Sequence, residues 1–414
     1  MAKNLLSKLG NSVKDFAKKA VLYSSIPLVM FASSCQKEEP SPWTNPRPPP
    51  VVNPPVNPPP VNTGPLYDNV KSLNADELSS DYSVGDDKLV FSNSVSGRYR
   101  AGDIVYSDVK TNTPYGALVK INSISADGKS ATISSASLDE AVKDGEFELT
   151  KRYTGSDLEG GRIALSDDNI SLGKSSYVNA RGQAYEFRLN FNEYVLYDDD
   201  KDLGTTLDQI TLNGGMDFEI ISNLKVKIKG ADTYVKSGLT MNGETEFIVH
   251  AGVLNLSLEK TIPVGEIYFN PIVATIGPLP VIILPKLYFE LGFGVDITSD
   301  ISSSLTESFT AAAGVVYEGG KWTPYKSFTN NFDFTPPVVS LDANLKASAT
   351  SGLELLLYGV VGPAGSIQGY YEAAANLQAD PWWEMYLGLR GDAKINMDKI
   401  SKRVALYQIN IFDD

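Results

Sequence analysis

The sequence contains one histidine and one cysteine, His250 and Cys35, so the common catalytic and metal-binding sets are incomplete. A Ser-His-Asp or Cys-His site needs its base within hydrogen-bonding reach of the nucleophile, and His250 is the one base of that kind. Phe247 and Val249 alternate with it in an apolar run, which predicts a structural histidine on the opposite face of a strand. Single copies also exclude multi-histidine zinc sites and Cys-x-x-Cys motifs.

Carboxylates remain as candidates for catalysis, because a glycoside hydrolase needs only two of them. The chain has 50 acidic residues, and their spacing selects no pair, so we assign no catalytic residue. The densest acidic run contains Asp198, Asp200 and Asp202. Its oxygen atoms would suit a calcium ion in a flexible loop, although Leu203 stands where an EF-hand needs glycine. A solvated hairpin turn is the alternative, and no other cofactor is expected.

Four aromatic side chains are candidates for stacking on sugar rings: Trp322, Tyr370, Tyr371 and Trp382. The alternative is that they are ordinary strand residues, because Tyr and Trp are common in sheets. The formal net charge is −14, and such an acid excess repels phosphate backbones. We therefore expect no nucleic acid as a partner. Stacking of these aromatics on sugar rings would make an extracellular polysaccharide the partner, and a surface protein is the other candidate.

Residues 1–34 have the organisation of a signal peptide. Five lysines precede an apolar run from Ala20 to Ala32, which is too short to span a bilayer, since that takes about 20 residues. The run ends in Ala32-Ser33-Ser34-Cys35, which resembles the lipobox of bacterial lipoproteins. The resemblance implies cleavage before Cys35 and lipidation of its thiol, and two or more acyl chains give stable membrane anchoring.

Lys37, Glu38 and Glu39 follow the cysteine and resemble the export signal of surface lipoproteins in the Bacteroidetes group. This resemblance implies a lipid anchor in the outer membrane and a body that faces the cell exterior; a solvated linker start is the alternative. Residues 40–65 contain twelve prolines in 26 positions, which excludes helix and sheet and favours a semi-rigid polyproline II spacer. We expect residues 35–65 to form a lipidated stalk, with a proline-rich docking ligand as the alternative.

Residues 66–155 are predicted to form a small β domain, either a barrel or a roll. Short β-prone runs are separated by turn signals at Asp127-Gly128 and Asp144-Gly145, and one helical turn is expected at 138–142. The β-prone runs cover residues 88–91, 103–106, 116–121 and 131–133. The segment 113–121 resembles a module of uncharacterised extracellular microbial proteins, which implies location and no activity.

Residues 156–414 are predicted to form a large antiparallel β domain with long strands. Apolar residues take alternate positions over 287–301 and 383–397, and period two over such lengths indicates strands with one buried face. Weaker alternation occurs over residues 185–197, 218–228, 305–317, 339–349 and 404–411. A sandwich or super-roll would supply the second apolar surface that these strands need. An outer-membrane barrel is the alternative.

Two further segments of the large domain give local predictions. Glu318-Gly319-Gly320-Lys321 is typical of a hairpin turn. The apolar segment 272–284, interrupted by Gly277-Pro278, is predicted to be a buried loop that crosses the core, with a membrane-dipping or ligand-cavity loop as the alternative. This half, including Pro381-Trp382-Trp383, also resembles uncharacterised secreted proteins without a known activity.

The sequence favours a non-enzymatic binding or adhesion protein at the cell surface, with a glycan as a candidate ligand. This expectation rests on the predicted lipid anchor, the proline-rich stalk, the two β domains and the incomplete sets of catalytic residues. A carboxylate-dependent glycoside hydrolase is the first alternative. A structural envelope protein or a lipid-binding protein with an apolar cavity is the second. A carboxylate pair in a groove would favour hydrolysis, and an apolar cavity would favour a lipid.

Overall fold

The computed structural model describes residues 66–83, 85–158, 161–173, 177–178, 184–200, 209–230, 232–251, 256–297, 301–339, 343–376, 378–395, 400 and 407–413. These residues are almost entirely strands, which confirms the predicted all-β fold. The signal peptide, the stalk, Cys35, Lys37, Glu38 and Glu39 lie outside the described residues. Lipidation and surface export therefore stay predictions.

The first sheet has five short strands and a core of its own. Its order is β1-β3-β4-β5-β2, with β1 parallel to β3 and the other pairs antiparallel. The strands are β1 (Val70–Ser72), β2 (Lys88–Val90), β3 (Ile104–Ser107), β4 (Ala117–Ile124) and β5 (Ser130–Ser135). Leu89, Phe91, Val119 and Ile121 are buried in its core. This order is open among the described strands, so they form a sheet and not a closed barrel.

The predicted turn and helix in this region are confirmed, with one exception. Gly128 has φ +71° between β4 and β5, and α2 (Leu138–Ala141) begins after Ser137, which forms a capping box with Glu140. Two short 3-10 turns, η1 (Ala75–Glu77) and η2 (Gly155–Leu158), lie nearby in the chain. The prediction of a turn at Asp144-Gly145 is wrong, because Gly145 pairs with Ile228 inside β6.

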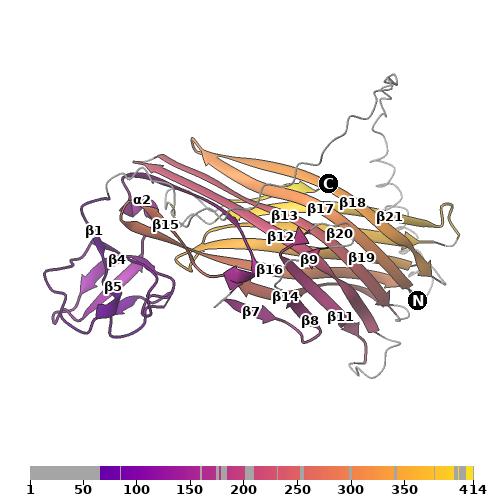
Figure 1. The fold of residues 1–414 in the computed structure, drawn as a ribbon, viewed down its shortest axis with the longest axis horizontal. Helices are drawn as coiled ribbons and strands as arrows, with labels where there is room; N and C mark the ends of the chain where they lie inside the picture. Colours follow the sequence, from indigo (N-terminus) through magenta and orange to yellow (C-terminus); the bar gives the residue numbers. More distant parts are fainter. Residues whose placement is uncertain are drawn as a thin grey trace, which may run out of the picture. The chain divides into compact units, whose positions relative to one another are not determined.

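Sheet 1 of the large region has seven strands. Its order is β18-β17-β13-β12-β11-β8, and β6 also pairs with β12 (Figure 1). The strands are β6 (Asp144–Arg152), β8 (Ile170–Gly173), β11 (Phe187–Asp198), β12 (Gln209–Lys229), β13 (Asp232–Ala251), β17 (Ile301–Glu318) and β18 (Lys321–Val339). β12 has 21 residues, against a usual five or six. The long strands predicted from the alternation are therefore present.

Sheet 2 has eight strands in the order β22-β21-β20-β19-β16-β14-β7, with β15 paired to β16. They are β7 (Arg162–Leu165), β14 (Leu256–Tyr268), β15 (Ile272–Ile276), β16 (Leu279–Ile297), β19 (Ala343–Leu357), β20 (Pro363–Ala375), β21 (Trp383–Ile395) and β22 (Tyr407–Asp413). A separate hairpin joins β9 (Tyr177–Val178) to β10 (Ala184–Tyr185). Neither large sheet closes on itself among the described strands.

The two large sheets bury their apolar faces against each other in one core. Leu287, Phe289, Leu291, Phe293 and Val295 on β16 are all buried, as the alternation predicts. They share a single cluster with the buried residues of β12, β13 and β17. The large region is therefore a sandwich of two sheets.

Two tight turns each connect a pair of antiparallel strands in the large region. Gly319 and Gly320 join β17 to β18 with φ values of +57° and +78°, and Glu318 pairs with Lys321, so the predicted hairpin is confirmed. The prediction of a core-crossing loop at 272–284 is wrong, because β15 and β16 form a hairpin there. Gly277 at φ +60° supplies the positive φ that a tight hairpin turn needs before Pro278.

The described helices are short turns. None of them has the length and apolar character that crossing a membrane would require.

Candidate functional site

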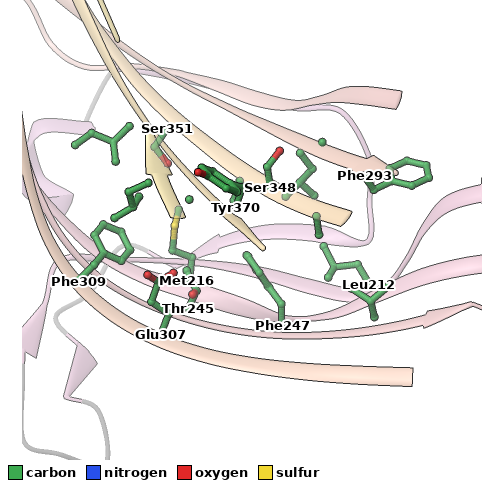
Figure 2. Close-up of a pocket in the computed structure, with 18 of the residues that line it drawn as sticks. Leu212, Met216, Thr245, Phe247, Phe293, Glu307, Phe309, Ser348, Ser351 and Tyr370 are labelled. Carbon is green, nitrogen blue, oxygen red and sulfur yellow. The ribbon is translucent and has the colours of Figure 1, made fainter. Parts of the chain in front are cut away.

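An apolar cavity lies between the two large sheets. It offers about 50 Å³ to the centres of water-sized molecules. Since one water needs about 10–15 Å³ on this scale, it holds a few water-sized groups, such as a short run of methylene units. Figure 2 shows side chains of sheet 1, including Met216, Phe247 and Phe309, facing side chains of sheet 2, including Phe293 and Ser351.

Small residues on sheet 2 create this space. Ala347 and Ala349 on β19 and Gly369 on β20 line the cavity, and Ala349 pairs with Gly369 across the two strands. Opposite them, sheet 1 presents larger side chains such as Met241 and Phe309. The sheets are held at the separation set by these larger side chains, so the short side chains of β19 and β20 leave a gap.

Glu307 on β17 is the one acidic side chain among the described residues that line the cavity. It is 7% exposed, and the Asn330 side chain donates a hydrogen bond to its Oε1 over 3.2 Å. Its other oxygen, Oε2, lies 3.7 Å from the position that a Cβ atom on Gly369 would take. The Glu307 carboxyl group therefore points from sheet 1 toward the space that Gly369 leaves in sheet 2.

Burial raises the pKa of Glu307, because desolvation disfavours its charged form, while the hydrogen bond from Asn330 opposes the shift. The protonated carboxyl is consequently favoured over a wider pH range than in an exposed glutamate. A neutral carboxyl both donates and accepts a hydrogen bond. Buried hydroxyls of Thr245 and Ser351 line the same space.

This set of groups is suited to binding rather than to a two-carboxylate reaction. Glycoside hydrolysis needs a second carboxyl group about 5–9.5 Å from the first, and the described lining contributes only Glu307. Apolar walls with a few convergent polar groups are typical of sites for small apolar or amphipathic ligands. The geometry thus favours a ligand with an aliphatic part and a polar end.

The predicted calcium site is only partly within the described residues. Asp198 ends β11 and accepts a hydrogen bond from the Gln209 side chain over 3.2 Å, and Asp200 follows it in a bend. Asp202 lies outside the described residues. Among the residues that are described, no group of three or more His, Cys, Asp or Glu side chains is arranged to hold a metal ion.

His250 lies on β13 as predicted. Its side chain is exposed, whereas Phe247 and Val249 point into the core. It pairs with Thr211 and Ser302 on the neighbouring strands. The structure therefore places it on the outer face of sheet 1, away from the intersheet cavity.

The four predicted glycan-stacking aromatics are not brought together as one group. Trp322 packs on Tyr317, with ring centroids 4.9 Å apart, and contacts the core. Tyr370 on β20 is among the residues that line the intersheet cavity, but its position three residues after the buried Ile367 puts its side chain on the outer face of sheet 2. The side chain of Tyr371 is outside the described set. Trp382 precedes β21 and is 39% exposed.

Sequence reasoning missed Glu307, although the sequence held a signal for it. Glu307 belongs to the alternating run 305–317 and is in phase with Phe309, Ala311 and Ala313, so it occupies the face predicted to be buried. An acid in phase with a buried face indicates a functional or hydrogen-bonded carboxyl.

Comparisons with protein family models, curated proteins and solved structures find no match to this chain.

Proposed function

We propose that this chain is a non-enzymatic, lipid-anchored surface protein that binds the aliphatic part of an amphipathic molecule between its two large sheets. The observation that supports the proposal is the apolar intersheet cavity with the buried carboxyl of Glu307. Methylene groups would replace empty space beside Ala347 and Ala349. Each buried methylene contributes about 0.8 kcal/mol.

The polar end of the ligand would lie at Glu307. A neutral carboxyl can exchange hydrogen bonds with an alcohol or a carboxylic acid, and Thr245 pairs directly with Glu307 across β13 and β17. A ligand with both features would satisfy the polar and the apolar parts of the cavity together. This ligand class corresponds to the lipid-binding alternative of the sequence analysis, within the broader class of surface binding proteins.

Ligand binding is tested by calorimetric titration of the full-length protein with pentan-1-ol and with pentanoic acid, whose short chains match a cavity of this size. Ala349→Leu would place three further carbons beside Gly369 and Glu307, so we expect the affinity for both ligands to fall about tenfold, or 1.4 kcal/mol. Ala312→Leu adds the same atoms on the outer face of sheet 1, since Ala312 alternates with the buried Ala311 and Ala313. It should leave the affinity unchanged.

Failure of both molecules to bind would count against the proposed ligand class. Equal affinity in wild-type protein and Ala349→Leu would place the ligand elsewhere. Circular dichroism of both variants shows whether the sheets are retained, because overpacking a core destabilises a protein by about 1–3 kcal/mol.

The anchor has a separate test in bacteria that express the full chain. Cys35→Ala removes the sulfur that would carry the lipid, so we expect the protein to move from the membrane fraction to the soluble fraction. Replacement of Lys37, Glu38 and Glu39 by alanine should keep membrane retention and reduce cleavage by a protease added outside intact cells. Unchanged membrane retention of Cys35→Ala would refute the anchor.

A further inference from the structure

Exposed aromatic side chains gather at one strand of sheet 2. Tyr386 on β21 is 42% exposed and Trp382, just before this strand, is 39% exposed. Leu389 and Ala393 of β21 point into the core, so Tyr386, three residues from Leu389, belongs to the outer face. Large apolar side chains at the surface often mark an interaction site when they lie together.

The strand register places Tyr370 beside Tyr386 on this outer face. Tyr370 pairs with Gly388, and Tyr386 pairs with Glu372, so the two tyrosines occupy a diagonal position on adjacent antiparallel strands. Diagonal neighbours lie about 7–8 Å apart, within reach of aromatic rings. Tyr370 and Tyr386 therefore form a two-ring strip, which we call the tyrosine strip.

A shallow groove continues from the tyrosine strip across the outer face of sheet 2. It has a volume of about 320 Å³ and is lined by Tyr370, Gln368, Thr261 and Glu372 among others. Gly292 on β16 also lines it. Because glycine has no side chain, it leaves room for the Ser348 hydroxyl, which covers this part of the floor.

The charged residues that line the groove are two acids and two bases: Glu259, Glu372, Lys260 and Lys346. Lys346 Nζ lies 3.3 Å from Glu372, and Arg390 Nε lies 2.9 Å from Asp392. Gln368 donates a hydrogen bond to Ser348 over 3.2 Å, and the Tyr386 hydroxyl donates to Glu384 over 2.9 Å. The groove thus offers aromatic faces and hydrogen-bonding groups with no excess of one charge, which suits an uncharged, hydroxyl-rich ligand.

We infer that the outer face of sheet 2 binds an uncharged, extended polysaccharide, with the tyrosine strip stacking on sugar rings and the groove bonding to sugar hydroxyls. β-1,4-linked chains present ring faces along an extended ribbon, which can lie across the neighbouring strands β20 and β21. This site lies on the outer face of sheet 2, whereas the intersheet cavity lies on its inner face, and Gly292, Ala347, Ser348 and Tyr370 line both. Polysaccharide binding does not depend on the proposed aliphatic ligand. A polysaccharide outside the cell would reach it without entering the sandwich.

The test is calorimetric titration of the full-length protein with cellohexaose, xylohexaose and mannohexaose. We expect at least one of them to bind, and Tyr386→Ala to weaken that binding about tenfold, or 1.4 kcal/mol. Tyr386→Phe keeps the ring and should retain the affinity. Tyr115→Ala is the matched control, because Tyr115 is 39% exposed in the chain between β3 and β4, and should also retain it.

Failure of all three hexasaccharides to bind the wild-type protein would overturn the inference. So would an equal loss of affinity in Tyr386→Ala and Tyr115→Ala. Ala349→Leu separates this site from the cavity: it should leave hexasaccharide binding intact while it weakens pentan-1-ol binding, and Tyr386→Ala should do the reverse.

Discussion

Replacing Phe218 by alanine is expected to lower the free energy of unfolding by about 3–5 kcal/mol. Phe218 on β12 is fully buried, and its ring contacts Phe187 of sheet 1 at a centroid distance of 5.4 Å and Phe289 of sheet 2 at 5.3 Å. The substitution removes a contact within one sheet and a contact between the sheets. Edge-to-face aromatic pairs add about 0.5–1.5 kcal/mol to the free energy from area burial alone.

The measurement is urea unfolding followed by circular dichroism. Phe218→Leu keeps much of the volume and should lose considerably less stability than Phe218→Ala. Ile248→Ala is the surface control, because Ile248 on β13 is 41% exposed, and surface substitutions usually change stability by less than about 0.5 kcal/mol. A loss below about 1 kcal/mol in Phe218→Ala would show that the sheets do not depend on this aromatic contact.

The sandwich could be predicted because apolar and polar residues alternate along a strand that has one buried face and one exposed face. On β16 the alternation from Leu287 to Val295 matches the buried face residue by residue. The end of the predicted strand 287–301 is wrong, because β16 ends at Ile297 and Ile301 is the first residue of β17. Alternation reports which face is buried, but it does not report where one strand ends and another begins.

The sequence predicts a loop where β15 and β16 form a hairpin, because prolines in this segment indicate a break in a strand. Pro280 pairs with Thr275 inside the hairpin, and its carbonyl accepts a hydrogen bond from the buried Tyr358 hydroxyl over 2.7 Å. Proline removes only one donor from a ladder and keeps its carbonyl acceptor, and here a neighbouring residue, Tyr358, satisfies that carbonyl. That neighbour is 78 residues away in the chain, and local sequence gives no sign of it.

The intersheet cavity could not be predicted, because it depends on which strands face each other. Ala349 and Gly369 are brought together by the pairing of β19 and β20, and Glu307 comes from β17 in the opposite sheet. Each residue is ordinary in its own strand. The gap arises only when short side chains of one sheet meet the carboxyl of the other, which is a property of the tertiary arrangement.

Glu307→Gln is expected to change the pH dependence of stability. Desolvation raises the pKa of Glu307 in the folded protein above its ordinary value of 4.5. Below pH 4.5 both the folded and the unfolded chain hold the proton. Above it the unfolded chain releases the proton while the folded chain keeps it, so the unfolded state binds fewer protons and the free energy of unfolding falls as pH rises. The fall ends once the pH passes the raised pKa of the folded state.

Glutamine cannot ionise, so the variant should lack this fall in stability. The difference in unfolding free energy, variant minus wild type, should therefore increase with pH from about 4.5 upward and then level off. Asp217 also has a pKa raised chiefly by desolvation, with Arg188 opposing the shift. Its contribution has the same sign in both proteins and cancels in the difference.

Urea unfolding at a series of pH values provides the measurement, and Glu318→Gln provides the matched control. Glu318 ends the same strand as Glu307 and is exposed, so its replacement should leave a curve parallel to that of wild type. A difference curve for Glu307→Gln that is flat, or that falls with pH, would mean that water reaches the carboxyl. The cavity would then be wet, and the aliphatic part of a ligand would have no dry surface to bury.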